Sequence, residues 1–166
     1  MLMFGIQLVL FTQLFHGKCP GGDLFEEIAD TCYYFSIDRG ERHTWDEARR
    51  FCPDIGSLLD ETVDLAEIGN EATCQSDGLM LQKIAEKGEW SWLGGSDEEQ
   101  EASWKWVTSG RSLSLKDSAW REIDPNNGAD QNCLVAVIAG DYHRTYLGDL
   151  PCNNDGFKHP FVCQLF

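Results

Sequence analysis

Seven cysteines constrain the fold of this chain more than any other feature of its sequence. Residues 1–15 ahead of them are almost continuously apolar and carry no charged side chain, which is typical of a secretory signal peptide. Cysteines in a secreted domain indicate a framework of disulfides. Zinc is the weaker alternative, because no two cysteines form a CxxC pair. Since the number is odd, one thiol is left over. The cysteines are Cys19, Cys32, Cys52, Cys74, Cys133, Cys152 and Cys163.

The apolar start and the length of the chain predict its domain organisation. We expect a signal peptide at residues 1–17 and one domain at residues 18–166, because 166 residues is an ordinary length for a single domain. The apolar segment is shorter than the roughly 20 residues of a membrane span, so we expect a secreted, extracellular protein with no membrane span. An uncleaved anchor is the alternative for two reasons. The segment lacks a basic start, and cleavage after Gly17 would leave the bulky Phe15 at position −3, where signal peptidase prefers a small residue.

The net charge of −15 excludes some classes of partner. Nucleic acids and anionic lipid head groups are bound through Lys and Arg, so we expect neither to be a partner. An acidic surface suits metal cations. The solubility of a secreted domain explains the same charge equally well.

Apolar patterning predicts two helices followed by strands. Thr44 and Glu47 form a capping box, which predicts a helix from Trp45 to about Cys52 with Pro53 stopping it. A short strand or a helix start is expected at residues 58–59, and a second helix is expected to end at Gly88. Strands are expected at residues 33–35, 90–95, 104–107, 134–138, 146–147 and 161–165. The run at 134–138 is apolar throughout, which predicts burial on both faces. This layout is α+β.

A polar loop between Trp120 and Cys133 is the first candidate for a functional site. It combines carboxylates and amides with Pro and Gly, and Ca²⁺ takes six to eight oxygen ligands from such side chains. The same residue types are ordinary turn formers, so a solvated surface loop is the alternative. The oxygen-bearing residues are Asp124, Asn126, Asn127, Asp130 and Gln131.

The order of the motifs resembles the C-type lectin-like domain family, in its long form with an N-terminal hairpin. The resemblance extends from Cys19 to Cys163 and rests on the ordered set rather than on any single motif. It implies two helices with antiparallel β-sheets and long loops. The matching pieces are Cys32-Tyr33-Tyr34-Phe35, Trp45-Asp46-Glu47-Ala48, Cys52, Trp92-Leu93-Gly94-Gly95, Trp104-Lys105-Trp106, Trp120, Pro125-Asn126, Cys133, Cys152 and Cys163.

The same resemblance implies three disulfides within the chain: Cys19–Cys32, Cys52–Cys163 and Cys133–Cys152. Cys74 is outside the family's pattern and lies in what looks like an insertion between the two helices. It is either a free thiol or an intermolecular disulfide. We favour the latter, as a disulfide-linked homodimer, because exposed thiols of secreted proteins seldom stay reduced.

Calcium-dependent members of the family hold one Ca²⁺ between two triplets, and the ion binds two hydroxyl groups of a sugar. Asp124-Pro125-Asn126 stands where the family has Glu-Pro-Asn, and Asp149 ends the second triplet. The resemblance therefore implies Ca²⁺ ligands at Asp124, Asn126 and Asp149, and a cis peptide bond before Pro125. The carboxylate-first order goes with mannose- or glucose-type sugars in the family.

Two departures from the family's pattern predict a weakened Ca²⁺ site. Gly148 stands where the family has Asn and offers no side-chain ligand. Gln131 stands where a Glu ligand is usual, which removes one charge, and affinity for Ca²⁺ falls with the charge of its ligands. Gln131 remains a carbohydrate-binding candidate together with Asp124, Asn126 and Asp149.

The resemblance implies a secreted carbohydrate-binding lectin that depends on Ca²⁺ and takes part in innate-immune recognition of microbial glycans. The alternative is a calcium-independent member of the same fold that binds a protein partner. We expect no enzyme, because His43, His143 and His159 stand in no recognisable nucleophile or metal motif.

Overall fold

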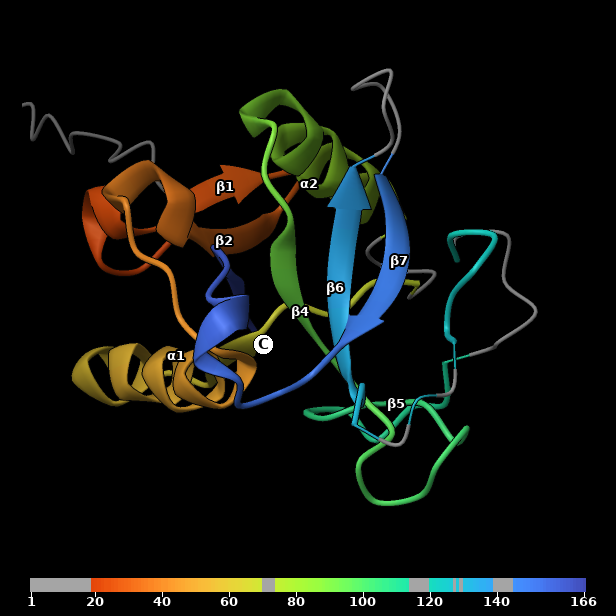
Figure 1. The fold of residues 1–166 in the computed structure, drawn as a ribbon. Coiled ribbons are helices and arrows are strands. Elements are labelled where there is room, and N and C mark those ends of the chain that lie inside the picture. The colour runs from red at the N-terminus through yellow and green to blue at the C-terminus, as the bar shows by residue number, and fades with distance from the viewer. Residues whose placement is uncertain (1–18, 70–73, 114–119, 127, 129, 139–144) are drawn as a thin grey trace, which may run out of the picture.

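The computed structural model describes residues 19–69, 74–113, 120–126, 128, 130–138 and 145–166, without the side chains of 74–76. These residues form two four-stranded antiparallel sheets and two α-helices (Figure 1). The expected α+β fold is therefore confirmed. No helix among them has the length and apolar character needed to cross a membrane. The predicted signal peptide at residues 1–17 lies outside the described part of the chain.

The first sheet joins the two ends of the domain. Its order is β1 (Glu26–Ile28), β2 (Thr31–Phe35), β8 (Val162–Leu165) and β3 (Val63–Leu65), and all neighbours are antiparallel. β1 and β2 form the expected N-terminal hairpin, and the disulfide Cys19–Cys32 fastens the preceding segment to it. Tyr34 of β2 pairs with Cys163 of β8, so the beginning and the end of the domain share one sheet.

The second sheet carries the candidate site at one end. Its order is β5 (Lys105–Trp106), β4 (Ser91–Ser96), β6 (Cys133–Ile138) and β7 (Thr145–Leu150). Side chains of β6 alternate between two apolar clusters: Val135 and Val137 belong to one, and Leu134 and Ala136 to the other. The expected burial of this strand on both faces is therefore confirmed.

Helix α1 (Trp45–Leu59) begins where the capping box predicts. The Thr44 hydroxyl accepts a hydrogen bond from the Glu47 backbone N–H at 3.3 Å, and the Glu47 carboxylate accepts one from the Thr44 N–H at 2.9 Å. The two reciprocal bonds satisfy donors that a bare helix end leaves open.

The prediction that Pro53 stops α1 is wrong. The helix continues for six more residues, and residues 58–59 form its last turn rather than a strand or a new helix. Proline lacks the N–H that would bond to the carbonyl of Arg49, which weakens a helix interior. Burial of Cys52 and Ile55 on both sides of Pro53, together with the disulfide Cys52–Cys163, holds the helix against the first sheet and offsets that loss.

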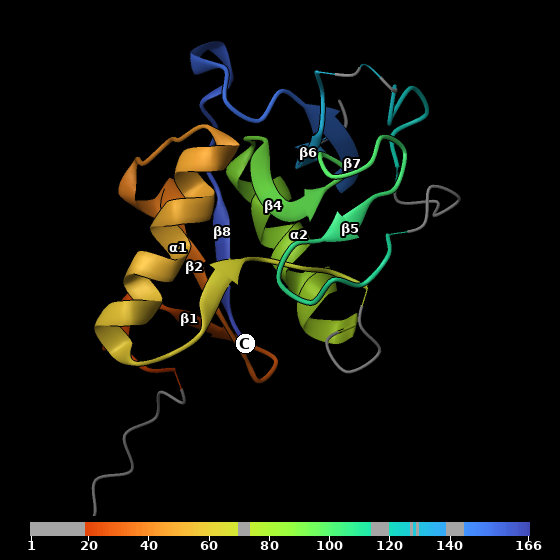
Figure 2. The same ribbon diagram turned by 90° about the horizontal axis from the view of Figure 1, so that it is seen from below.

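Helix α2 (Cys74–Lys87) connects the two sheets. It contacts β1 of the first sheet and β6 and β7 of the second, and Figure 2 shows it beneath β4 in that view. Met80, Ile84 and Ala85 are buried, and Gly88 ends the helix with a φ of 73°, so the predicted end is confirmed. Cys74 is its first residue. Its side chain lies outside the described residues, so the disulfide-linked homodimer stays a prediction.

Strand β3 was missed by the sequence patterns because it lies in an acidic stretch. Asp64 at its centre is 6% exposed and forms an ion pair with Arg49 of α1. Its carboxylate also accepts hydrogen bonds from the Thr108 hydroxyl at 2.8 Å and from the Leu65 N–H at 2.7 Å. Because the Asp64 carboxylate is paired, its burial costs little free energy. The number of charges along the sequence does not reveal this pairing.

Replacing Thr44 by alanine is expected to cost about 1 kcal/mol of unfolding free energy, because the Glu47 N–H loses its capping acceptor. Urea unfolding followed by circular dichroism measures the change. Thr62→Ala, at an exposed position, is the matched control and should change stability by much less. Equal effects of the two substitutions would contradict a role of the cap.

Candidate functional site

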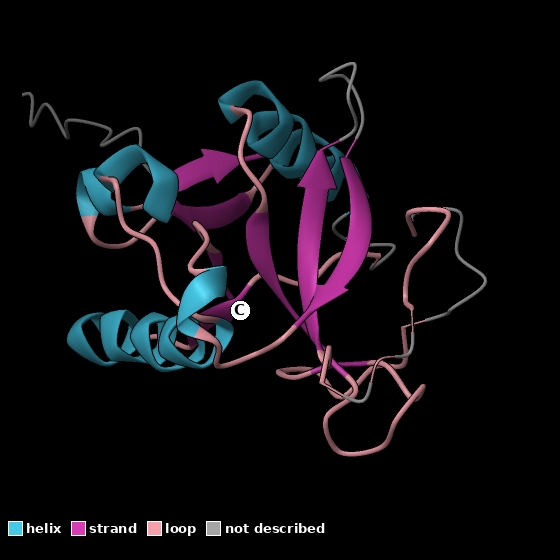
Figure 3. Cartoon of the chain, viewed as in Figure 1, coloured by secondary structure: helices cyan, strands magenta, loops and turns pink. Residues whose placement is uncertain are grey.

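The candidate site lies where residues 120–126 run beside β7. Trp120 forms a parallel bridge with Leu147, and the Arg121 N–H donates to the Leu147 carbonyl at 2.9 Å. The buried Trp120 ring packs edge-on against Trp104 with 5.1 Å between ring centroids. The loops around this segment extend beyond β7, on the side of the second sheet away from α1 (Figure 3). Trp120 thus anchors the polar loop to the core.

The Asp124 carboxylate is buried and ion-paired. Its Oδ2 accepts a hydrogen bond from Arg121 Nε at 2.6 Å, and its Oδ1 has no hydrogen-bond partner among the described residues. The Arg121 guanidinium also lies 5.5 Å from the centre of the Trp90 ring. The peptide bond between Asp124 and Pro125 is cis, as the family resemblance implies.

Asp149 is the second buried carboxylate and lies next to the first. It sits on β7 opposite Leu134 of β6, is 2% exposed, and accepts hydrogen bonds from the Asn126 backbone N–H at 3.2 and 3.3 Å. Burial raises the pKa of Asp149 from 3.8 to about 6; the Asn126 N–H opposes this rise and the charge of Asp124 adds to it. Asp149 therefore resists ionisation in its buried place beside Asp124.

Gly148 makes room for this pair. A Cβ at position 148 would lie 2.8 Å from Asp124 Oδ2 and 2.8 Å from a methyl carbon of Val137. The short Asp124 side chain thus occupies the space that a larger residue at 148 would need. The departures at 124 and 148 from the family's pattern are coupled by this contact.

Two amides form the outer part of the site: Asn126 is exposed and Gln131 is half-buried. Asn126 Nδ2 donates to Gln131 Oε1 at 3.3 Å, and the Gln131 backbone N–H donates to the Gly128 carbonyl at 2.7 Å. Asn126 therefore links the amides to the carboxylates, since its backbone binds Asp149 and its side chain binds Gln131. Asp130 is exposed in the adjoining turn, whereas Asn127 lies outside the described residues.

The structure brings the four predicted residues into one network, in two layers. Asp124 and Asp149 form the buried layer, and Asn126 and Gln131 form the outer one. The disulfide Cys133–Cys152 ties the start of β6 to the segment after β7. All three disulfides that the resemblance implied are thus present.

Two residues of this region were missed at the sequence level. Arg121 is one, and the signal that points to it is the Arg-x-x-Asp spacing across a turn. Asp97 is the other: its backbone N–H donates to the Asn132 carbonyl at 3.2 Å, its Oδ1 has no partner among the described residues, and burial raises its pKa. Its position directly after the buried strand β4 is the available signal. The neighbouring Glu98 and Glu99 are exposed.

The described histidines pack against aromatic rings. His43 and His159 pair through their backbones, and the His159 ring lies 5.3 Å from that of Trp92. Burial lowers the pKa of His159, which favours its neutral form. His143 lies outside the described residues.

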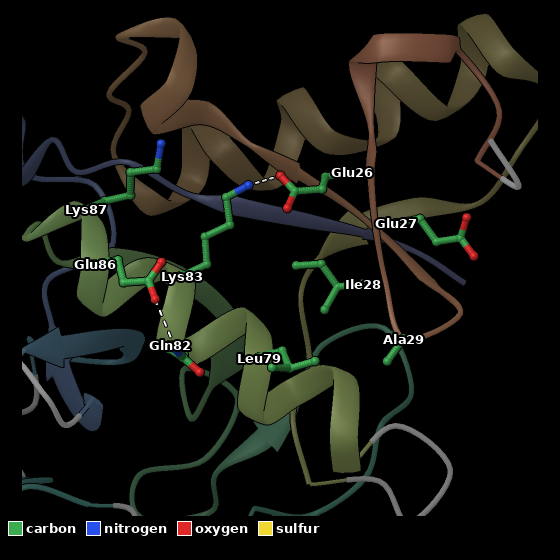
Figure 4. A pocket seen from close by; sticks show the side chains of 9 residues that line it. All are labelled: Glu26, Glu27, Ile28, Ala29, Leu79, Gln82, Lys83, Glu86 and Lys87. Atoms are coloured by element: carbon green, nitrogen blue, oxygen red, sulfur yellow. Dashed lines mark hydrogen bonds and ion pairs between the residues drawn. The ribbon is translucent and has the colours of Figure 1, made fainter. Parts of the chain in front are cut away.

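A pocket of about 560 Å³ lies between β1 and α2 (Figure 4). Lys83 forms an ion pair with Glu26 across it, and Gln82 donates to Glu86 at 2.9 Å. Lys83 and Glu26 thus neutralise one another across the pocket, and none of the four site residues lines it. Within the described part of the chain, no three His, Cys, Asp or Glu side chains gather as a metal cluster. A cation site built from these residues therefore has to include amide oxygens.

Comparison with known proteins places this geometry in a family. The lectin C-type domain matches residues 41–165. The chain is 28% identical to a perlucin-like protein of Mytilus galloprovincialis, covering 88% of this chain and 82% of that protein. It is 32% identical to C-type lectin domain family 17, member A of Homo sapiens, over 88% of this chain but only 32% of that protein. It therefore spans most of the first relative and about a third of the second.

Solved structures agree with the sequence comparison. The mouse scavenger receptor C-type lectin carbohydrate-recognition domain is similar with a TM-score of 0.62 and 26% identity, covering 88% of this chain and 94% of that one. The C-type lectin CEL-I from Cucumaria echinata is similar in fold, with a TM-score of 0.66 and 19% identity over 90% of this chain and 99% of that one. The chain belongs to the lectin C-type domain family.

Proposed function

We propose that this protein is an extracellular lectin that binds glycans through Asp124, Asn126, Gln131 and Asp149, and that the binding depends on Ca²⁺. The observation that carries the proposal is the pair of buried carboxylates next to two amides, of which Asn126 is exposed and Gln131 half-buried. Family membership supports carbohydrate binding as the general activity. A binding protein rather than an enzyme fits this site, because it offers oxygen donors to a ligand and no activated nucleophile.

The donor set fits the chemistry of calcium. Ca²⁺ prefers carboxylate and amide oxygens, and Asp124 Oδ1 is a buried oxygen with no partner among the described residues. A divalent cation between Asp124 and Asp149 would offset the burial and the neighbouring charge that disfavour ionisation of Asp149. When bound, the ion would supply open coordination positions for two sugar hydroxyls. Asp124, Asn126 and Asp149 would hold it.

The two amides would contribute the direct contacts with the sugar. Asn126 and Gln131 each carry a donor and an acceptor, and their present hydrogen bond of 3.3 Å is long enough to be exchanged for bonds to a ligand. We propose mannose- or glucose-type sugars, from the order of carboxylate and amide around Pro125, and microbial surface glycans as their source. Contact with one sugar is weak, so several sites acting together would raise the affinity.

A calcium-independent binding protein is the second candidate. The observation that favours it is the ion pair between Arg121 and Asp124, which already neutralises one of the two carboxylates. Gly148 also favours this candidate, because it provides no side-chain ligand for calcium. In this case the same surface would bind a protein partner.

Glycan-array binding of residues 18–166 in millimolar calcium tests the proposal. Signals for mannose- or glucose-type glycans should be lost on adding EDTA and in Asp149→Ala. Asp54→Asn removes a charge at an exposed position of α1 and should bind like the unchanged protein. Absence of any glycan signal in calcium would remove the proposal, and a signal that persists in EDTA would favour the second candidate.

We further propose a disulfide-linked homodimer through Cys74. The three disulfides leave this cysteine over, and disulfides persist in oxidising compartments. Electrophoresis without reductant should show a dimer that becomes a monomer in Cys74→Ser. Only monomer before reduction would count against it.

A further inference from the structure

Arg121 is held so that its charge points at the candidate calcium site. Its N–H is bonded to Leu147, and its carbonyl accepts from the Asp124 N–H at 2.8 Å. Its Nε donates to Asp124 Oδ2 at 2.6 Å, while the guanidinium lies over Trp90. The Arg121 side chain is 34% exposed and that of Asp124 is fully buried. These backbone and side-chain contacts thus hold a cation beside the buried Asp124 carboxylate.

This ion pair competes with a metal for the charge of the Asp124 carboxylate, because Arg121 holds Oδ2 and leaves Oδ1 without a partner among the described residues. A hydrogen bond from a charged donor to a buried carboxylate is stronger than a neutral one. Calcium would have to displace the guanidinium from Asp124 or share the carboxylate with it, and either change weakens the metal's binding. Trp90 offers the released guanidinium a face on which a cation is stable.

Gly148 belongs to the same arrangement. Because position 148 has no Cβ, Asp124 Oδ2 can lie above it, within reach of Arg121. A side chain at 148 would push the carboxylate away by steric contact. Gly148 therefore has two effects. It permits the ion pair between Arg121 and Asp124, and it offers calcium no side-chain ligand.

We propose that Arg121 is a tethered cation that occupies the Asp124 carboxylate in the calcium-free protein, so that its displacement sets the calcium concentration at which the site fills. The inference rests on the proposed calcium dependence of glycan binding. It adds that the Arg121–Asp124 ion pair determines how much calcium that binding requires. It makes Arg121 a positioning residue, since it acts on the ion through Asp124. A lectin regulated in this way is empty in calcium-poor surroundings and loads when calcium is abundant.

Isothermal titration of calcium into Arg121→Gln tests the inference by binding alone, without a glycan. Affinity is expected to rise about tenfold, because the carboxylate is no longer neutralised in the calcium-free state. Arg50→Gln removes the same charge from an exposed position on α1 and should raise affinity less than twofold. Arg121→Lys keeps a cation beside Asp124 and should stay within about threefold of the unchanged protein.

The outcomes separate this inference from the proposed function. Equal calcium affinities of the unchanged protein and Arg121→Gln would overturn the inference and leave calcium-dependent binding intact. Binding by neither would overturn both. Binding by Arg121→Gln alone would support the inference and show that the ion pair closes the site. If Arg121→Gln is unfolded without calcium, Arg121→Lys, which keeps the cation, and the concentration of calcium that folds Arg121→Gln, corrected for its unfolding free energy, provide the comparison.

Discussion

Replacing Asp149 by asparagine is expected to stabilise the calcium-free protein at pH 7.5 by about 3 kcal/mol and to remove its stabilisation by calcium. Burial holds the pKa of Asp149 at about 6, against 3.8 for an ordinary aspartate, and roughly two pKa units correspond to about 3 kcal/mol. Because the folded pKa is the higher one, this carboxyl group contributes stability below about pH 4 that is lost as pH rises through about 6. An asparagine has no such loss, and its amide can still accept from the Asn126 N–H.

Urea unfolding in EDTA between pH 4 and pH 8 measures this effect. The stability difference between Asp149→Asn and the unchanged protein should grow across that range and level off above pH 7. Asp54→Asn, at an exposed site on α1, is the matched control and should show no such growth. A difference that stays constant with pH would mean that Asp149 is not the group that titrates.

Removing the disulfide Cys52–Cys163 by a double alanine substitution is expected to cost about 4 to 5 kcal/mol. It closes a loop with a sequence separation of 111 residues, and the chain-entropy model gives about 4.7 kcal/mol for a loop near 100 residues. Both cysteines are fully buried between α1 and the first sheet, so the substitution also removes packing. Such a loss is comparable with the whole stability of many domains.

The disulfide Cys19–Cys32 provides a comparison within the same chain. Its sequence separation is 13 residues, for which the same model gives about 3 kcal/mol. Guanidinium unfolding of the two double-alanine variants should therefore rank the long-range disulfide as the more stabilising one. The opposite ranking would show that loop closure does not dominate its contribution.

Local patterns predicted those parts of the fold in which neighbouring residues decide the outcome. The capping box at Thr44 and Glu47 needs only four consecutive residues, and the apolar run of β6 needs only its own side chains. The end of α1 could not be predicted in this way. Proline at position 53 breaks an isolated helix, and only contacts with the first sheet and Cys163 reveal why this helix continues.

In the candidate site, too, the sequence predicted the residues but not the tertiary contacts between them. The resemblance predicted Asp124, Asn126, Gln131 and Asp149 as a group, and they do form one network. Contacts that set its electrostatics are not visible in the motifs. Asp124 and Asp149 are 25 positions apart, and the backbone contacts of residues 120–121 with Leu147 of β7 bring their segments together.

The missed part of the site is its counter-ion. Arg121 precedes the triplet by three residues, and no rule of composition distinguishes a surface arginine from one aimed at a buried carboxylate. Its position follows from the bridge between Trp120 and Leu147, which is a tertiary contact. The predicted weakening of the calcium site rested on Gly148 and Gln131, and Arg121 adds a third physical cause to that prediction.

A calcium titration followed by tryptophan fluorescence tests most directly whether the two carboxylates form a cation centre. Trp90 and Trp120 lie beside the site and report on it. We predict a saturable change with one ion per chain and a dissociation constant near the roughly 10⁻⁴ to 10⁻³ M range of extracellular modules, and no change in Asp149→Asn. A flat signal for the unchanged protein up to about 10 mM calcium, well above that range, confirmed as absence of heat by calorimetry, would contradict the account.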